Sequence, residues 1–184
     1  CTRISRQGNQ EISFNEQWIE IVQKFPQKIA VSDGTKTLDY HTFNERIEWY
    51  GSKIEYSGTG VLPLKLDRYV DDVALLMVCI LKNIPFIPID SDLPADRIAQ
   101  IESLCGQKAC SKDAFYQLVQ VRPNTSFNKE LVYCIATSGS TGVPKLVGVR
   151  KKGFLAAIQA WREQYVIDSE DRVLQAASFS FDVF

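Results

Sequence analysis

A short polar stretch carries the residues of this chain that are best suited to chemistry. The sequence reads ATSGSTGVPK up to Lys145, directly after the apolar run Leu131 to Ile135. Glycines let a backbone approach a ligand closely, and hydroxyl and ammonium groups add hydrogen-bond donors. Donors that converge on a small volume suit a phosphate chain, which a lysine neutralises as a point charge. The pattern therefore predicts a phosphate-binding loop. Its expected donors are Thr137, Ser138, Gly139, Ser140, Thr141, Gly142 and Lys145.

This loop differs from the G-x-x-x-x-G-K-[ST] loop of nucleotide hydrolases. Val143 and Pro144 stand between the second glycine and the lysine, and Leu146 follows the lysine where that pattern needs Ser or Thr. A nucleotide hydrolase is therefore disfavoured. An ordinary exposed Gly/Ser turn remains the alternative that composition alone allows.

The composition indicates a globular chain and excludes two classes of partner. Of the 184 residues, 45% are hydrophobic and 23% are charged, which suits one domain with a sizeable core. The net charge of -1 gives no attraction to nucleic acid or to anionic membranes. The longest apolar run, Val73 to Leu81, is far below the roughly 20 residues of a bilayer span, so it predicts a buried helix.

The five cysteines lack the spacing of a zinc site or a small disulfide scaffold. Cys79 and Cys134 lie inside apolar runs, so we expect small buried thiols in a cytoplasmic protein. The only histidine, His41, falls outside every motif. We expect no catalytic side chain and no metal site within this chain.

Hydrophobic periodicity predicts an alternation of strands and helices, which favours an α/β fold with a mostly parallel sheet and flanking helices. In such sheets ligands bind at the carboxyl ends of the strands, where the phosphate-binding loop would lie. The expected helices cover residues 13–26, 71–83, 94–104, 114–119 and 151–165. One more expected helix starts at a capping box formed by Thr42 and Glu45. The expected strands are two that flank the Asp33-Gly34 turn, 61–66, 85–90, 108–110, 131–135 and the terminal SFSFDVF.

The loop sequence YCIATSGSTGVPK resembles the signature [YF]-x-x-[YF]-T-S-G-[ST]-T-G-x-P-K-G of the adenylate-forming (AMP-binding) superfamily. That family includes acyl-CoA ligases, luciferases and the adenylation domains of nonribosomal peptide synthetases. Nine consecutive positions match, Thr137 to Lys145. The resemblance implies that the loop holds the β- and γ-phosphates of ATP while a substrate carboxylate attacks the α-phosphate.

Two earlier stretches resemble the same family, KIAVSDGTKTLDYHTFNER and ILKNIPFIPIDSDLPADRI. Their landmarks are typical of its amino-acid-activating branch, which comprises peptide synthetase adenylation domains and D-alanine carrier-protein ligases. The resemblance implies the incomplete large N-terminal subdomain of an adenylation domain over residues 13–184, with residues 1–12 as a linker or the tail of a preceding domain. We expect scaffold roles, rather than ligand contacts, for Pro88, Ile89, Asp90, Pro94 and Arg97.

The terminal SFSFDVF resembles the family segment F-S-F-D-x-S-V, in which the aspartate pairs with the α-ammonium group of the substrate. Asp182 occupies that position, and Phe181 would form a wall of the amino-acid pocket. A carboxylate at the end of an apolar strand is costly to bury unless a cation or donors compensate it, and a substrate ammonium group would do so. The alternative is a helix-capping or turn aspartate.

Several positions depart from the family pattern. Leu146 replaces the glycine after the loop lysine, Asn83 and Ile84 replace paired glycines, and Lys151 stands where His or Asn is frequent. These departures indicate a divergent member. Two other interpretations therefore stay open: an aryl- or acyl-CoA ligase, which needs no carboxylate at Asp182, and a non-catalytic adenylation fold that acts as an interaction platform.

The resemblance implies a two-step activity for the parent protein. An amino acid and ATP would give the aminoacyl adenylate and pyrophosphate, and the aminoacyl group would pass to a phosphopantetheine thiol on a carrier protein, next to neighbouring synthetase domains. The chain starts at Cys1 and ends at Phe184, which we interpret as the ends of a piece. The family's Mg²⁺ ligands, its ribose-binding aspartate and its C-terminal lysine would follow Phe184. We therefore expect the isolated 184 residues to be inactive.

Overall fold

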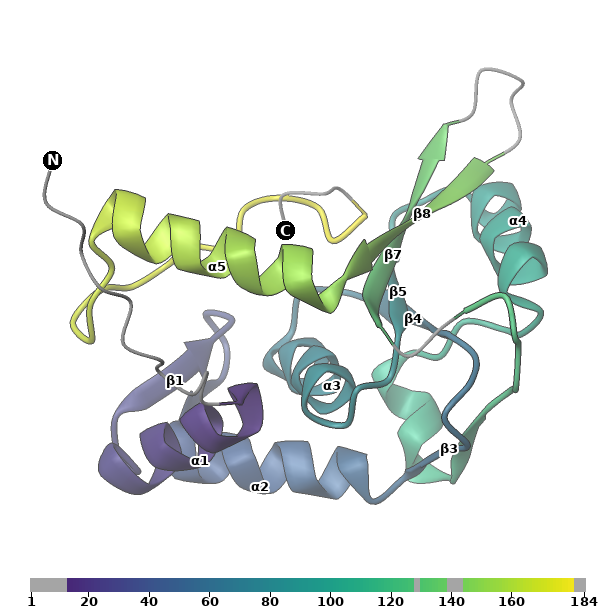
Figure 1. Ribbon diagram of the computed structural model, residues 1–184. Coiled ribbons are helices and arrows are strands. Elements are labelled where there is room, and N and C mark those ends of the chain that lie inside the picture. The colour runs from purple at the N-terminus through teal and green to yellow at the C-terminus, as the bar shows by residue number, and fades with distance from the viewer. Residues whose placement is uncertain (1–12, 128–129, 139–143, 181–184) are drawn as a thin grey trace, which may run out of the picture.

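A four-stranded sheet stands at the centre of the computed structural model, which describes residues 13–127, 130–138 and 144–180 (Figure 1). Its strands follow the order β4 (Leu62–Leu66), β5 (Phe86–Asp90), β7 (Leu131–Ser138) and β8 (Pro144–Arg150). The first three are parallel, whereas β8 pairs with β7 in the antiparallel sense. The carboxyl ends of β4, β5 and β7 therefore point toward one edge of the sheet, as the sequence predicts.

Helices cover both faces of this sheet. Strand β5 is buried along its whole length, and its side chains alternate between two apolar clusters. Phe86 packs in the cluster of α3 (Val70–Leu81), while Ile87 and Ile89 pack in the cluster of α4 (Ala95–Cys105). A strand with two buried faces needs apolar residues at nearly every position, which explains why this strand reads as a continuous apolar run.

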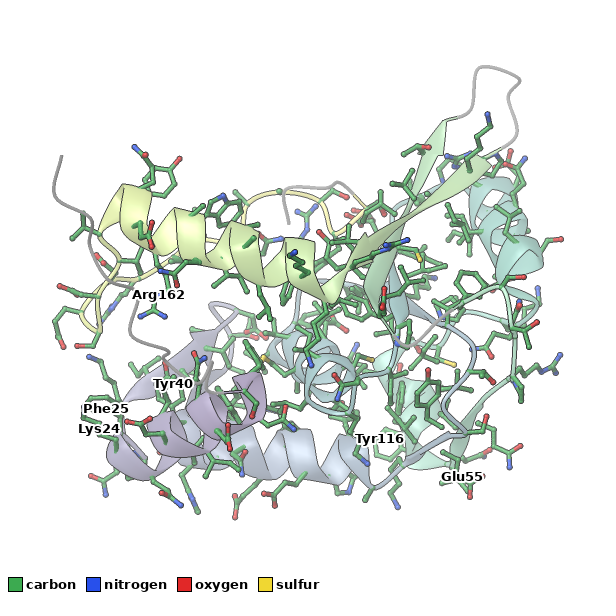
Figure 2. The ribbon with its side chains drawn as sticks, in the orientation of Figure 1. Lys24, Phe25, Tyr40, Glu55, Tyr116 and Arg162 are labelled. Carbon is green, nitrogen blue, oxygen red and sulfur yellow. The ribbon has the colours of Figure 1, made fainter. Side chains whose placement is uncertain are left out.

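A helical layer with a small hairpin precedes the sheet. Helix α1 (Phe14–Lys24) begins with a complete capping box, and Lys24 ends it with its ammonium group 5.3 Å from the ring centroid of Phe25 (Figure 2). The hairpin consists of β1 (Ile29–Ser32) and β2 (Thr37–Asp39), on either side of the predicted Asp33-Gly34 turn.

The start of α2 (Tyr40–Gly51) corrects one prediction. The sequence favoured a capping box from Thr42 to Glu45, but Asp39 is the N-cap, and its carboxylate accepts the amide of Thr42 at 2.8 Å. The helix begins earlier because strand β2 runs into it without a loop, so the last strand residue serves as the cap.

Three further corrections concern short elements beside the main sheet. A second parallel pair joins β3 (Ile54–Tyr56) and β6 (Val119–Val121), neither of which the sequence predicted. The helix expected over 114–119 is a 3₁₀ turn, η1 (Lys112–Tyr116), whose Tyr116 ring lies 5.8 Å from that of Trp49 (Figure 2). The strand expected at 108–110 amounts to one bridge, between Leu64 and Cys110.

Helix α5 (Lys151–Tyr165) has the predicted bounds but only part of the predicted buried face. It runs away from the sheet on the side of α1 and α3 (Figure 1). Phe154 and Ile158 are partly buried, whereas Trp161 is 52% and Tyr165 70% exposed. The following residues up to Ser180 form no strand, so the expected strand at SFSFDVF is wrong for its described part, 178–180.

The remaining sequence predictions concern thiols and membranes. Cys79, Cys105 and Cys134 are buried free thiols, as expected from their apolar surroundings, and Cys110 is partly buried. The run around Val73 to Leu81 lies in α3 and is mostly buried. Within the described ranges, no helix has the length and apolar character that crossing a bilayer would require.

Candidate functional site

The predicted phosphate-binding loop joins the two antiparallel strands of a hairpin. Strand β7 continues three residues beyond the predicted end at Ile135, because β8 pairs with it as far as Ser138. Thr137 lies opposite Lys145, and Ser138 lies opposite Pro144. The backbones of Thr137 and Ser138 thus belong to a strand, which corrects the expectation that the loop begins directly after Ile135.

The structure locates part of the predicted donor set. Thr137 donates its hydroxyl group to the carbonyl oxygen of Lys145 across the hairpin, at 3.3 Å. The Lys145 side chain is exposed at the start of β8. The two residues that flank the loop are therefore next to each other, with the lysine ammonium group accessible from solvent. Four predicted donors lie outside the described residues, namely Gly139, Ser140, Thr141 and Gly142.

A buried carboxylate ends the neighbouring strand β5. Asp90 is 6% exposed, and its Oδ2 atom accepts hydrogen bonds from Ser178 Oγ at 2.7 Å and from Arg68 Nη2 at 3.2 Å. Its Oδ1 atom accepts the amide of Asp92 at 3.3 Å. Burial by itself would raise the pKa of Asp90. The hydrogen bonds and the guanidinium charge of Arg68 have the larger opposite effect, so the pKa of Asp90 lies below its usual value. The carboxylate is therefore a stable acceptor at neutral pH.

The backbone of Arg68, one of the two side-chain donors to Asp90, is strained. Arg68 follows β4 and has φ of 68°, in the left-handed region that costs a residue with a side chain about 1–2 kcal/mol. Its partly exposed guanidinium group pairs with Asp90 on the neighbouring strand. Side chains from the ends of β4 and β5 thus meet at the carboxyl edge of the sheet.

The segment before the predicted substrate aspartate is fastened to this edge. Ser180 Oγ accepts the backbone amide of Asp90 at 2.8 Å, so Asp90 contacts both Ser178 and Ser180. Phe179, between them, is 2% exposed and belongs to the core cluster that α3 shares with β4. The predicted substrate-binding residues Phe181 and Asp182 lie outside the described residues.

Sequence reasoning placed Asp90 in the scaffold and missed its partners. The available signal was a charged residue at the end of an otherwise apolar strand, FIPID, which demands a compensating donor. Nothing local identifies that donor, because Ser178 lies 88 residues later in the chain. Of the other expected scaffold residues, Pro88 and Ile89 are buried in β5 and Pro94 is the N-cap of α4, next to Arg97 in its first turn.

The described residues contain no cluster of the side chains that usually bind metal ions. Within 13–127, 130–138 and 144–180, no three His, Cys, Asp or Glu side chains come together as a metal-binding group.

The chain is similar in sequence to known proteins, although no family model matches it. The chain is 34% identical over 177 residues to the probable nonribosomal peptide synthetase CymA of Salinispora arenicola, covering 88% of this chain and 2% of that protein. It is 30% identical over 195 residues to tyrocidine synthase 3 of Brevibacillus parabrevis, covering 93% and 3%. The chain therefore spans only a few per cent of the length of these curated relatives.

Solved structures share the fold. The N-terminal subdomain of Klebsiella oxytoca NpsA matches with a TM-score of 0.71 at 18% identity, over 91% of this chain and 49% of that one. The same subdomain, in complex with 3-hydroxybenzoyl-AMSN, matches with a TM-score of 0.70 at 20% identity, over 91% and 48%. The nonribosomal peptide synthetase FmoA3 matches with a TM-score of 0.74 at 17% identity, over 91% and 20%. At these identities the likeness establishes the fold.

Proposed function

We propose, from the premise that this chain belongs to the adenylate-forming superfamily, that it is part of an adenylation domain that activates an amino acid with ATP. The observation that carries the proposal is the hairpin at the carboxyl end of β7, whose flanking residues Thr137 and Lys145 adjoin a loop with the family's signature. The sequence relationship to nonribosomal peptide synthetases supports it. Residues 13–184 would be the first part of the domain, with residues 1–12 as a linker or a preceding tail.

The proposed chemistry needs no nucleophilic side chain. The carboxylate of the amino acid attacks the α-phosphorus of ATP, a P–O bond to the α-phosphate breaks, and pyrophosphate leaves with the aminoacyl adenylate as product. The contribution of the protein is to orient the reactants and to screen the negative charge that accumulates between them. Hydroxyl groups, backbone amides and the Lys145 ammonium group would hold the β- and γ-phosphates.

The proposed substrate class rests on a carboxylate. Asp182 would pair with the α-ammonium group of the amino acid, and Phe181 would line its pocket. This pairing favours amino acids over the aryl and fatty acids that other adenylate-forming enzymes activate. Bound Mg²⁺ would neutralise phosphate charge, with ligands mostly outside this chain. We further propose a phosphopantetheine carrier protein as acceptor, neighbouring synthetase domains as partners, and a cytoplasmic location.

The test is amino-acid-dependent exchange of pyrophosphate into ATP by the full-length protein. Each proteinogenic amino acid, β-alanine and a set of aryl and fatty acids would be supplied in turn. We expect exchange with one amino acid, and we expect Asp182→Ala to abolish it. Asp113→Ala, which removes an exposed carboxylate in η1, is the matched control and should leave exchange unchanged.

The other outcomes separate the competing functions. Exchange with an aryl or fatty acid that ignores Asp182→Ala would move the protein to the CoA-ligase branch. Absence of exchange with every acid, in a folded protein that binds no ATP, would favour a non-catalytic interaction platform. The isolated 184-residue chain should show no exchange, and activity in that chain would contradict our division of the domain.

A further inference from the structure

One hydrogen-bonded cluster joins the carboxyl edge of the sheet to the segment that leads toward Asp182. We call it the Asp90 anchor and define it as Arg68, Asp90, Ser178 and Ser180. Asp90 contributes two different groups to it: its carboxylate accepts the Ser178 hydroxyl at 2.7 Å, and its backbone amide donates to the Ser180 hydroxyl at 2.8 Å. Two contacts to alternate residues of one segment fix both its position and its direction.

Burial makes this anchor costly to break. Asp90 is 6% exposed, and a buried carboxylate that loses a donor keeps its desolvation penalty. Phe179 adds an apolar contact between the two serines, since its side chain is 2% exposed within the core cluster. Ser178 and Ser180 are therefore held by the carboxylate and the backbone amide of Asp90, and Phe179 is held by the core cluster.

The anchor acts close to the proposed substrate site because of chain length. Asp182 follows Ser180 by two residues, a separation that a polypeptide spans in at most about 7 Å. The carboxylate proposed to bind the substrate ammonium group is thus covalently close to a fixed point. Binding groups contribute most when the rotation and translation of their backbone are already restricted.

We infer that Asp90 is a positioning residue for amino-acid binding: it fixes the backbone at Ser178 and Ser180, two residues before Asp182, the residue proposed to contact the substrate. This inference rests on the proposed function, and it assigns no contact between Asp90 and the substrate. Arg68 supports the anchor by holding the Asp90 carboxylate from the end of β4.

The inference predicts a selective kinetic effect in the full-length protein. Ser178→Ala and Asp90→Ala should each raise KM for the amino acid by about tenfold, the effect expected from the loss of one charge-assisted hydrogen bond, and should leave KM for ATP unchanged. The double variant should be no worse than the more impaired single variant, because both changes remove the same contact. Ser178→Thr keeps a hydroxyl group and should restore much of the loss.

A matched control separates positioning from general stability. Glu102 in α4 also accepts hydrogen bonds from a side-chain ammonium, that of Lys108 at 2.7 Å, and from a backbone amide, that of Ala109 at 2.9 Å, but these partners do not belong to the anchor. Glu102→Ala should lower the thermal unfolding midpoint while leaving KM for the amino acid unchanged. Hydrogen–deuterium exchange of residues 178–184 should rise in Asp90→Ala but not in Glu102→Ala.

Each outcome bears on one proposal. The inference is overturned, with the proposed function intact, if wild-type protein exchanges pyrophosphate with an amino acid and the folded Ser178→Ala and Asp90→Ala variants keep its KM. Parallel increases in KM for ATP and for the amino acid would also overturn it, because they indicate a general structural defect. Absence of exchange in the wild-type protein would overturn the proposed function, and with it the ligand that the inference assigns.

Discussion

Lys151 at the start of α5 donates a hydrogen bond of 3.1 Å to the side-chain oxygen of Asn83, just after α3. Both residues depart from the pattern of the adenylate-forming family, in which His or Asn is frequent at the first position and glycine at the second. Asn83 has φ of 53°, in the left-handed region that glycine adopts freely and asparagine tolerates better than most residues. Asn83 thus has a conformation that glycine would also adopt, and its hydrogen bond joins the turn after α3 to the start of α5.

Asn83 provides a test of this conformation. Asn83→Gly should keep the left-handed turn and change the urea midpoint of the full-length protein only slightly, whereas Asn83→Ala should destabilise the turn by about 1–2 kcal/mol. Lys151→Ala removes the same hydrogen bond without straining the backbone, so its effect should be smaller than that of Asn83→Ala. Equal effects of Asn83→Gly and Asn83→Ala would show that the left-handed conformation does not matter for stability.

Gly60 tolerates no side chain. Its φ is 107°, and an added Cβ atom would lie 2.2 Å from the backbone oxygen of Arg122. Gly60→Ala should therefore destabilise the protein by about 2–4 kcal/mol, as judged by urea unfolding. Gly153 in α5 is the matched control: its added Cβ atom would meet nothing within 4 Å, so Gly153→Ala should stabilise by about 0.5–1 kcal/mol. Similar losses in both variants would contradict the packing described for Gly60.

Lys145 tests the loop through its ligand. Under the proposed function, Lys145→Ala should raise KM for ATP by about 10- to 100-fold in pyrophosphate exchange, because it removes the proposed charge-assisted contact to phosphate. Lys152→Ala removes an exposed lysine in the first turn of α5 and should have no such effect. If both variants kept the wild-type KM, the loop lysine would have no role in binding ATP.

Asp72 links stability to pH. It is fully buried, and its Oδ2 atom accepts the amides of Asp67 at 2.8 Å and Tyr69 at 2.9 Å. Burial raises the pKa of Asp72 above its usual value. As pH rises from about 4, the unfolded chain ionises first, so the contribution of this group to stability is greatest at low pH and decreases toward neutrality.

Asp72→Asn removes this titration while keeping an acceptor for the two amides. We expect the variant to gain stability relative to wild type as the pH is raised from 4 to 7, in urea unfolding curves recorded across that range. Asp96→Asn, which makes the same change at an exposed position in α4, is the control and should leave the urea midpoint at pH 7 close to that of wild type. A stability difference between Asp72→Asn and wild type that is the same at every pH would contradict the direction of the pKa shift.

The buried cysteines should be unreactive in the folded protein. Burial raises the pKa of Cys105 to about 12 and that of Cys134 to about 11, and it raises the pKa of the fully buried Cys79 as well. Because the thiolate is the reactive form, these three thiols should resist a disulfide reagent at pH 8 and react once urea unfolds the chain. If peptide mass mapping showed that any of the three thiols is modified in the folded protein without urea, their burial would be contradicted.

The sequence predicted this fold well where hydrophobic periodicity and turn residues are local signals. The apolar run of α3, the alternation that led to a parallel sheet and the Asp33-Gly34 turn were all visible in short stretches. Other features depend on distant partners. Strand β7 is longer than its apolar run because β8 pairs with it, and Asp39 replaced Thr42 as the cap because β2 runs directly into α2.

The candidate site likewise has one part that the local sequence reveals and one part that it does not. The loop and its lysine are recognisable from composition and from the family signature, since the donors stand side by side in the sequence. The Asp90 anchor is not, because its strongest contact joins residues 88 positions apart. Local patterns show that Asp90 needs a donor, but only the packed structure identifies Ser178 and Ser180.

The pairing of Ser138 with Pro144 also determines how the loop would respond to a change of length. The pairing of β7 with β8 already holds Ser138 next to Pro144, so the entropy of closing the intervening loop is lost when the protein folds and not when a ligand binds. Doubling the length of a flexible loop costs only about 0.6 kcal/mol. Inserted residues would therefore scarcely affect folding but would disperse the proposed phosphate donors, so under the proposed function any restriction on loop length would come from the ligand rather than from the fold.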